Sequence, residues 1–112
     1  MADKVEWSDE AIADVEALAE YISRTPPVNA DRVVQAIRAS ALKLPDFPNA
    51  HRVIPEFGDP ERRETFVHRW RLMYRVLPDR IRIVGVIHGN RPLDMIEGRA
   101  FEEAPQQEYL AS

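Results

Sequence analysis

The sequence of 112 residues contains no cysteine. This absence excludes disulfide bonds and cysteine-based zinc sites, and it fits a reducing compartment. Residues 1–4 lack the basic segment and the apolar run of a secretory signal. The longest apolar candidate, residues 83–87, is only as long as a strand, whereas a membrane-spanning helix needs about 20 apolar residues. We therefore expect a cytoplasmic protein without membrane contact.

Signatures of common cofactor and metal sites are also missing. No glycine-rich phosphate loop is present. The three histidines, His51, His68 and His88, lie 17 and 20 residues apart, so they lack the i, i+4 spacing of a helical metal pair. Ser8 fits a helix cap better than a nucleophile. The sequence predicts neither a metal nor a cofactor.

Lysine is scarce, and the basic residues are unevenly distributed. Residues 1–50 carry 5 Lys/Arg and 9 Asp/Glu, residues 51–91 carry 9 Arg and 5 Asp/Glu, and residues 92–112 carry 1 Arg and 5 Asp/Glu. No lysine follows Lys43. Arginine is preferred where planar carboxylates or phosphates are bound. A solvated strand face explains the same charges without a ligand, and charge alone favours that interpretation.

Two amphipathic helices are predicted in the first half of the chain. Ser8 is a suitable N-cap for a helix over about residues 9–23, because its side-chain oxygen can accept a backbone N–H. A second helix should begin near Asn29 and end at Leu44-Pro45, after the Thr-Pro-Pro sequence of residues 25–27 has stopped the first. Apolar residues recur at helical spacing in both, so we expect an antiparallel hairpin with its apolar stripes in the core.

Strands are predicted at residues 5–7, 64–68, 69–76 and 80–88. A proline-rich, irregular connection over residues 45–61 precedes the last three, and Pro78-Asp79 forms the turn between the final two. In the strand over 69–76, a period of two places Arg69, Arg71 and Arg75 on one face and apolar side chains on the other.

The resulting order is β-α-α-β-β-β, an α+β fold in which the helical hairpin packs on one face of a small, mostly antiparallel sheet. The opposite face should be rich in arginine. The last strand is apolar on both faces over residues 83–87, as expected for a central strand. We assign residues 1–93 to one domain and leave open whether the acidic tail, residues 94–112, is ordered.

Several motifs follow one another along the chain: Trp7-Ser8-x-x-Ala11, the helix exit from Leu44 to Pro48, Tyr74-Arg75, and a final strand that ends in His88-Gly89-x-Arg91. In this order they resemble the RelE/ParE toxins of bacterial type II toxin–antitoxin modules, over roughly residues 4–93. The resemblance implies a growth-inhibiting toxin that a cognate antitoxin holds silent.

RelE-like members of that family are ribosome-dependent endonucleases that cut mRNA. The resemblance to them implies that Arg71 and Arg91 stabilise the charge that builds on the phosphorane, while a further residue acts as general acid or base. His68 and His88 are the candidate substitutes for that residue, because an imidazole titrates near the working pH. The sequence departs from this pattern. The lysines expected on the preceding strand and the tyrosine expected shortly after Arg91 are missing.

ParE-like members instead inhibit DNA gyrase by protein contact, with no chemistry of their own. The helical hairpin and the Tyr74-Arg75 pair suit this group better. A net charge of -4 also suits it better than insertion into the ribosome, which favours a positive surface. We therefore expect a ParE-like gyrase inhibitor. A RelE-like nuclease is the alternative, and a non-toxic family member that binds an antitoxin is the third interpretation.

The implied antitoxin folds its C-terminal segment on binding, covers the helical hairpin and reaches towards the arginine face. Any DNA contact would be made by the antitoxin. The residues predicted to bind a partner or target are Arg69, Arg71, Arg75, His88 and Arg91. Trp70 and Tyr74 are expected in the core, and Gly89 is expected at a turn that needs a positive φ.

Overall fold

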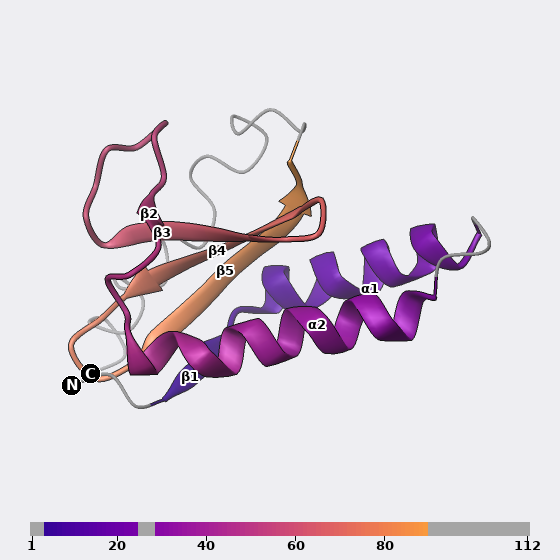
Figure 1. The fold of residues 1–112 in the computed structure, drawn as a ribbon, viewed down its shortest axis with the longest axis horizontal. Helices are drawn as coiled ribbons and strands as arrows, with labels where there is room; N and C mark the ends of the chain where they lie inside the picture. The colour runs from indigo at the N-terminus through magenta and orange to yellow at the C-terminus, as the bar shows by residue number, and fades with distance from the viewer. Residues whose placement is uncertain (1–3, 25–28, 90–112) are drawn as a thin grey trace.

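The computed structural model describes residues 4–24 and 29–89. In chain order its elements are β1 (Val5–Trp7), α1 (Asp9–Ser23), α2 (Ala30–Lys43), the 3-10 helix η1 (Leu44–Asp46), β2 (Arg52–Val53), β3 (Arg62–Val67), β4 (Trp70–Val76) and β5 (Ile81–His88). The five strands form one sheet in the order β1-β5-β4-β3-β2. Strand β1 runs parallel to β5, and the other pairs are antiparallel. Both helices lie on the same side of this sheet (Figure 1), so the predicted α+β architecture is confirmed.

The helix boundaries follow from local side-chain capping. The Ser8 Oγ accepts a hydrogen bond from the Ala11 backbone N–H at 3.0 Å, and the Asn29 Oδ1 accepts one from the Arg32 N–H at 3.3 Å. Each bond satisfies one of the backbone donors that a helix start leaves without an intrahelical partner. Both predicted caps are confirmed. In the described part of the chain, no helix is long and apolar enough to cross a membrane.

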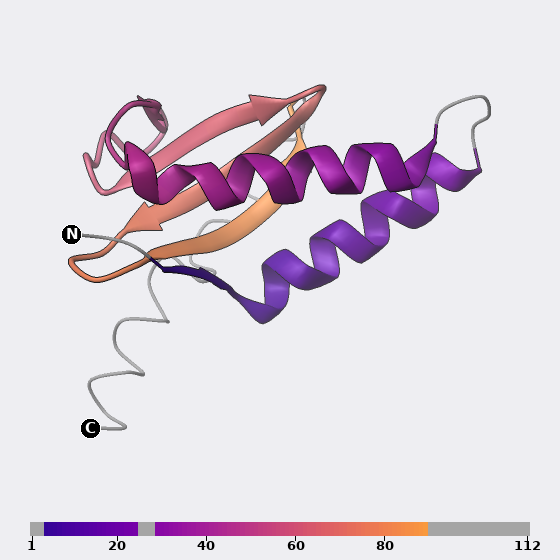
Figure 2. The same ribbon diagram turned by 60° about the horizontal axis from the view of Figure 1, so that its bottom comes forward.

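The main core lies between the helical hairpin and the sheet. Its members are buried apolar residues of both helices and of the three longest strands, among them Leu18, Ile37, Leu72, Tyr74 and Ile83. The two helices run together across the sheet and extend past its end (Figure 2). Tyr74 is fully buried, as predicted, whereas Trp70 is only partly buried and packs at the edge of this core.

The sequence did not predict a second, smaller core on the opposite face of the sheet. Ile54 from the segment after β2 is fully buried there against Met73, Val84 and Ile87, with Phe57 packed at the side. A register shift at Met73/Tyr74 makes this possible, because it gives β5 one extra residue and keeps apolar side chains on both faces. Strand β2 was also missed: two residues are too few for a period of two to be recognised.

The Tyr74 hydroxyl is buried and has no hydrogen-bond partner among the described residues. Burial raises the pKa of Tyr74 to about 12, despite the opposing charge of Arg63. A buried hydroxyl without a partner costs about 1–3 kcal/mol of stability. The aromatic ring contributes to the core, and its polar group weakens that contribution.

We predict that Tyr74→Phe stabilises the protein by about 1 kcal/mol in urea unfolding, because it removes only the unpaired hydroxyl.

In the native protein, Tyr74 is neutral in the fold up to about pH 12, whereas it ionises at its ordinary pKa of 10.0 when unfolded. The free energy of unfolding is therefore unaffected by this ionisation below pH 10.0, and it falls as the pH rises from there towards about 12, because the unfolded chain loses the Tyr74 proton first. The Phe variant should lose less stability than the native protein over this interval. A clearly destabilised Tyr74→Phe protein would mean that the hydroxyl has a partner.

Candidate functional site

Arginine side chains line the face of the sheet that the helices leave open. Arg62, Arg75 and Arg82 are register partners on adjacent strands, so they form one row across β3, β4 and β5. Like charges directly opposite each other destabilise a sheet unless they are compensated. Each arginine of the row pairs with a carboxylate: Arg62 with Asp59 at 3.4 Å, Arg75 with Glu61 at 3.3 Å and Arg82 with Glu6 at 2.7 Å. The row is therefore locally neutralised.

The Glu6 carboxylate shows how strongly this row binds its counter-charges. Burial by itself would raise the pKa of Glu6, but the hydrogen bonds and charges of Arg82 and Arg80 outweigh burial and hold that pKa below its usual value. The Arg80 Nε lies 2.9 Å from the Glu6 Oε1. One carboxylate on β1 thus links two arginines at the start of β5.

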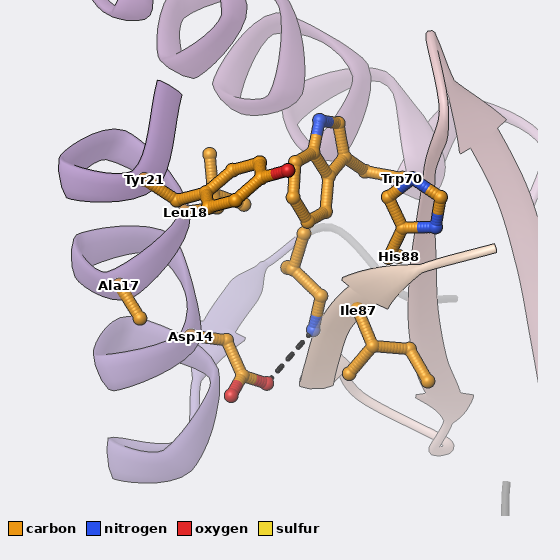
Figure 3. A pocket seen from close by; sticks show the side chains of 8 residues that line it. Asp14, Ala17, Leu18, Tyr21, Trp70, Ile87 and His88 are labelled. Atoms are coloured by element: carbon orange, nitrogen blue, oxygen red, sulfur yellow. Dashed lines mark hydrogen bonds between the residues drawn. The ribbon is translucent and has the colours of Figure 1, made fainter. Parts of the chain in front are cut away.

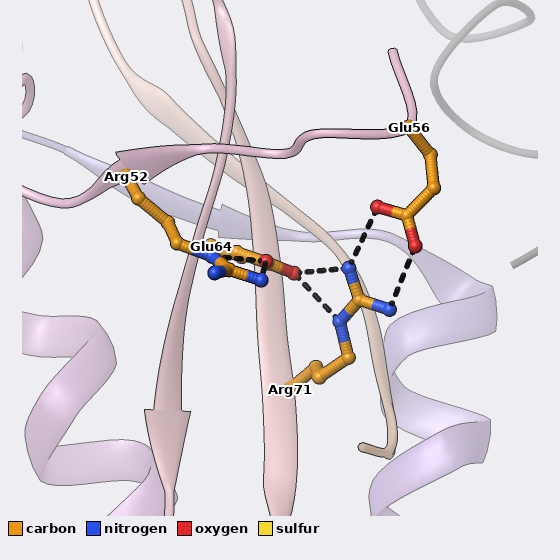
Figure 4. A network of polar contacts seen from close by, with 4 residues as sticks. All are labelled: Arg52, Glu56, Glu64 and Arg71. Carbon is orange, nitrogen blue, oxygen red and sulfur yellow. Dashed lines mark hydrogen bonds and ion pairs between the residues drawn. The ribbon is translucent and has the colours of Figure 1, made fainter. Parts of the chain in front are cut away.

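Arg71 lies near the start of β4, on the same face as Arg75, and is buried, with 5% of its side chain exposed. Its Nε donates to Glu64 Oε1 at 2.6 Å, and its terminal nitrogens face Glu56 at 3.2 and 3.4 Å. The other oxygen of Glu64, which is fully buried, accepts from the Arg52 Nε at 2.6 Å. Figure 4 shows the four side chains as one chain of alternating charges.

The two ends of this network differ in strength. A buried carboxylate such as Glu64 is tolerated only because two guanidinium groups neutralise it and satisfy its oxygens. Glu56 is about half exposed. The hydrogen bond from Arg71 holds the pKa of Glu56 below its usual value, while partial burial acts in the opposite direction. Because solvent reaches Glu56, we expect its pair with the buried Arg71 to contribute less to stability than the pair between Arg71 and Glu64.

A cleft of about 510 Å³ lies on the helix side of the sheet, between α1 and the end of β5. Strand β1 pairs with β5 only as far as Ile83, so α1 borders the remaining edge. There the Asp14 Oδ2 accepts a hydrogen bond from the Val86 backbone N–H at 3.0 Å. The carboxylate takes the place that an acceptor on a neighbouring strand would occupy, which helps to protect the edge from unwanted pairing.

Aromatic side chains form the mouth of this cleft. Trp70 and His88 are register partners on β4 and β5, and their rings meet edge to face with centroids 5.3 Å apart. Tyr21 comes from the opposite wall on α1 and is exposed. Figure 3 shows the α1 residues on one side and the strand residues on the other. An apolar cleft lined by aromatic rings and a carboxylate is suited to receive a side chain of a partner protein.

Comparison with known proteins agrees with this fold. The family model described as "ParE toxin of type II toxin-antitoxin system, parDE" matches residues 5–93. The chain belongs to the ParE toxin family. A solved structure described as "Chromosomal ParDE TA system from P. aeruginosa" has a TM-score of 0.62 and 23% sequence identity, and the match covers 76% of this chain and 94% of that chain. At this identity the likeness shows the fold alone. No curated protein matches the sequence significantly.

Those predicted site residues of this ParE-family chain that the structure describes do not all lie together. Arg71 and Arg75 share the open face, as predicted from their spacing, but Arg69 precedes β4 and lies in the turn after β3. His68, in the same turn, has a positive φ of 56°. His88 faces the helix side, beside Trp70. The other candidate, Arg91, and the tail over residues 94–112 lie outside the described residues.

The prediction that Gly89 supplies a positive φ is wrong: among the described residues, His68 and Gly58 have that backbone conformation and Gly89 does not. Gly89 is needed for space instead. A Cβ at this position would lie 3.0 Å from the Phe66 ring and 3.3 Å from the Arg69 carbonyl oxygen, which accepts the Gly89 N–H at 2.8 Å. Glycine therefore allows the end of β5 to approach the turn before β4 closely.

Sequence patterns did not identify the carboxylates that shape both sites. Asp14 lies within the helix predicted over residues 9–23, Glu56 in the irregular connection over residues 45–61, and Glu64 at the start of the strand predicted over residues 64–68. The strand over residues 69–76, in which arginines alternate with apolar residues, gives only one indication that carboxylates lie nearby: buried arginines require carboxylate partners. The pairing of β3 with β4 and the path of residues 54–58 decide which carboxylates form ion pairs with these arginines.

We predict that Glu64→Gln destabilises the protein by about 3 kcal/mol, because it leaves two guanidinium groups beside a neutral amide in a buried position. Urea unfolding measures the difference. The matched control is Glu61→Gln, which removes a carboxylate of the same face at an exposed pair and should change stability by less than about 0.5 kcal/mol. Equal effects of the two substitutions would contradict the central role of Glu64.

Proposed function

We propose that this ParE-family protein inhibits DNA gyrase by direct contact and that a cognate antitoxin neutralises it. The observation that carries the proposal is the separation of the groups that a nuclease would need. Arg71 pairs with Ile87 across the strands, and His88 follows Ile87, so the side chains of Arg71 and His88 point to opposite faces of the sheet. They are not placed to act on one phosphate.

The state of Arg71 supports the same conclusion. Transition-state stabilisation requires donors aimed at the position where charge develops. In this chain the Arg71 fork is buried and directed at two carboxylates of the protein itself. His68 lies in an exposed turn, and its use as a base would need Arg71 to face the same phosphate. A mechanism based on protein contact requires none of these groups to react.

The helical hairpin offers a surface for the antitoxin. A groove of about 280 Å³ is formed by residues of β1, α1 and α2. It is lined by Trp7, Ile12, Val15 and Val34, with Glu16 and Arg38 also lining it. Ile12 is a large apolar residue that remains exposed. An amphipathic segment that folds on binding covers such a surface well. Arg69, Arg71, Arg75, His88 and Arg91 remain our proposed contacts for the antitoxin or the target.

The test is inducible expression in a bacterium without the antitoxin, with plasmid supercoiling and amino-acid incorporation followed together. We expect early loss of supercoiling while translation continues. Arg75→Ala and His88→Ala should weaken this effect at least about tenfold in dose, if each contact contributes the roughly 1.4 kcal/mol that corresponds to that factor. Arg24→Ala, at an exposed pair with Glu20 on α1, is the matched arginine control and should leave the effect unchanged.

Two outcomes would contradict the proposal. Early arrest of translation with cut mRNA would establish the nuclease activity and would require Arg71 and a histidine to meet in another conformation. Normal growth, together with a stable antitoxin complex, would identify a non-toxic binding domain. If Arg71→Ala and Arg91→Ala changed neither antitoxin binding nor toxicity, those two residues would lose their proposed role.

A further inference from the structure

The two carboxylates that hold Arg71 do so unequally. Glu64 Oε1 lies 2.6 Å from both the Nε and one terminal nitrogen of Arg71. Glu56 faces the two terminal nitrogens at 3.2 and 3.4 Å. Charge-assisted N–H···O bonds are commonly about 2.7–2.9 Å. The inner carboxylate is therefore bound firmly, while the outer one makes two long contacts with the same fork.

Their surroundings differ in the same sense. The Glu64 side chain is 0% exposed, whereas that of Glu56 is 46% exposed. Glu56 belongs to a turn in which the Gly58 N–H donates to the Ile54 carbonyl at 3.0 Å. Gly58 has a φ of 64° and open space around its Cβ position. The turn is fixed at Ile54 by burial, and Glu56 is its solvent-facing side chain over Arg71.

A second anchoring point lies on the same face. Phe66 is the register partner of Arg71 and is 50% exposed. The Arg52 guanidinium lies over its ring, 5.8 Å from the centroid, and the Arg52 side chain is 57% exposed. A partly solvated arginine above an exposed aromatic ring offers both charge and apolar area to a peptide.

The charges of the network select the ligand. Without Glu56, the two arginines and the buried Glu64 leave one net positive charge. A single carboxylate balances that charge and matches the bidentate geometry of the Arg71 fork. A phosphate dianion would bring one negative charge more than the site can balance, and it would lie close to the buried carboxylate of Glu64. The lowered pKa of Glu56, caused first by its hydrogen bond from Arg71, is in keeping with a position that favours an ionised carboxylate.

We propose that Glu56 occupies a carboxylate-binding site on Arg71, and that a carboxylate side chain of an acidic partner peptide displaces it, with Arg52 and Phe66 as the neighbouring contacts. The inference rests on the proposed function in one respect: the partner that supplies the peptide is taken to be the antitoxin. Displacement of Glu56 leaves Glu64 in place, so the fold keeps its central ion pair while the outer one is exchanged.

The test uses the full chain and a short polyglutamate peptide, with the Arg71 Nε–H signal followed by NMR. We expect the peptide to shift this signal. Glu56→Gln should tighten binding of the peptide about tenfold. In the native chain the Glu56 carboxylate occupies Arg71 and competes with the peptide, and the neutral amide competes less. Glu61→Gln removes the same charge from the neighbouring exposed pair and should leave the affinity of the peptide near its native value.

Polyglutamine and inorganic phosphate are the comparison probes. Neither should shift the Arg71 signal at concentrations where polyglutamate does. An unmoved Arg71 signal in both the native chain and Glu56→Gln would overturn the proposal, as would tighter binding of phosphate than of polyglutamate. Equal gains in Glu56→Gln and Glu61→Gln would reduce the effect to net charge and overturn it as well. Because gyrase is absent from this experiment, its failure leaves the supercoiling result untouched, and the reverse also holds.

Discussion

The buried carboxylate of Glu64 is the interaction on which the open face of the sheet depends. An ionised group with no exposed surface is stable only when its charge and its oxygens are fully satisfied, and Arg71 and Arg52 do this from β4 and β2. The same contacts tie the short edge strand to the centre of the sheet. Once Arg71 is held inward, its guanidinium group is directed at two carboxylates of the chain itself.

The two faces of β5 explain the rest of the architecture. The strand is apolar on both sides, so one face requires the helical hairpin and the other requires the segment around Ile54. Because β1 covers only the first part of its edge, the remaining part meets α1, and the cleft of Asp14, Trp70 and His88 opens there. The cleft and the arginine face therefore lie on opposite sides of one strand pair. A partner that engages both must pass around the end of the sheet.

The local elements were predictable because their signals are local. Ser8 and Asn29 cap the helices through contacts three residues away, and the period of two on β4 predicted the shared face of Arg71 and Arg75. The misses involve interactions over longer distances in sequence. Glu56 meets Arg71 across 15 residues and Asp14 meets Val86 across 72. No periodicity records such contacts. The role of Gly89 was likewise mistaken, because spatial crowding leaves no mark in the sequence.

The sequence by itself determined the fold class, the helix limits, the shared face of Arg71 and Arg75, and the resemblance to the RelE/ParE toxins, since each depends on residue type and spacing along the chain. Only the tertiary structure decided which carboxylates neutralise the arginines and which face of the sheet each candidate side chain occupies. Arg71 is buried between two glutamates, and His88 is turned to the other face beside Trp70. The physical reason is that an ion pair depends on the distance between its charges, and strand register and loop path set that distance.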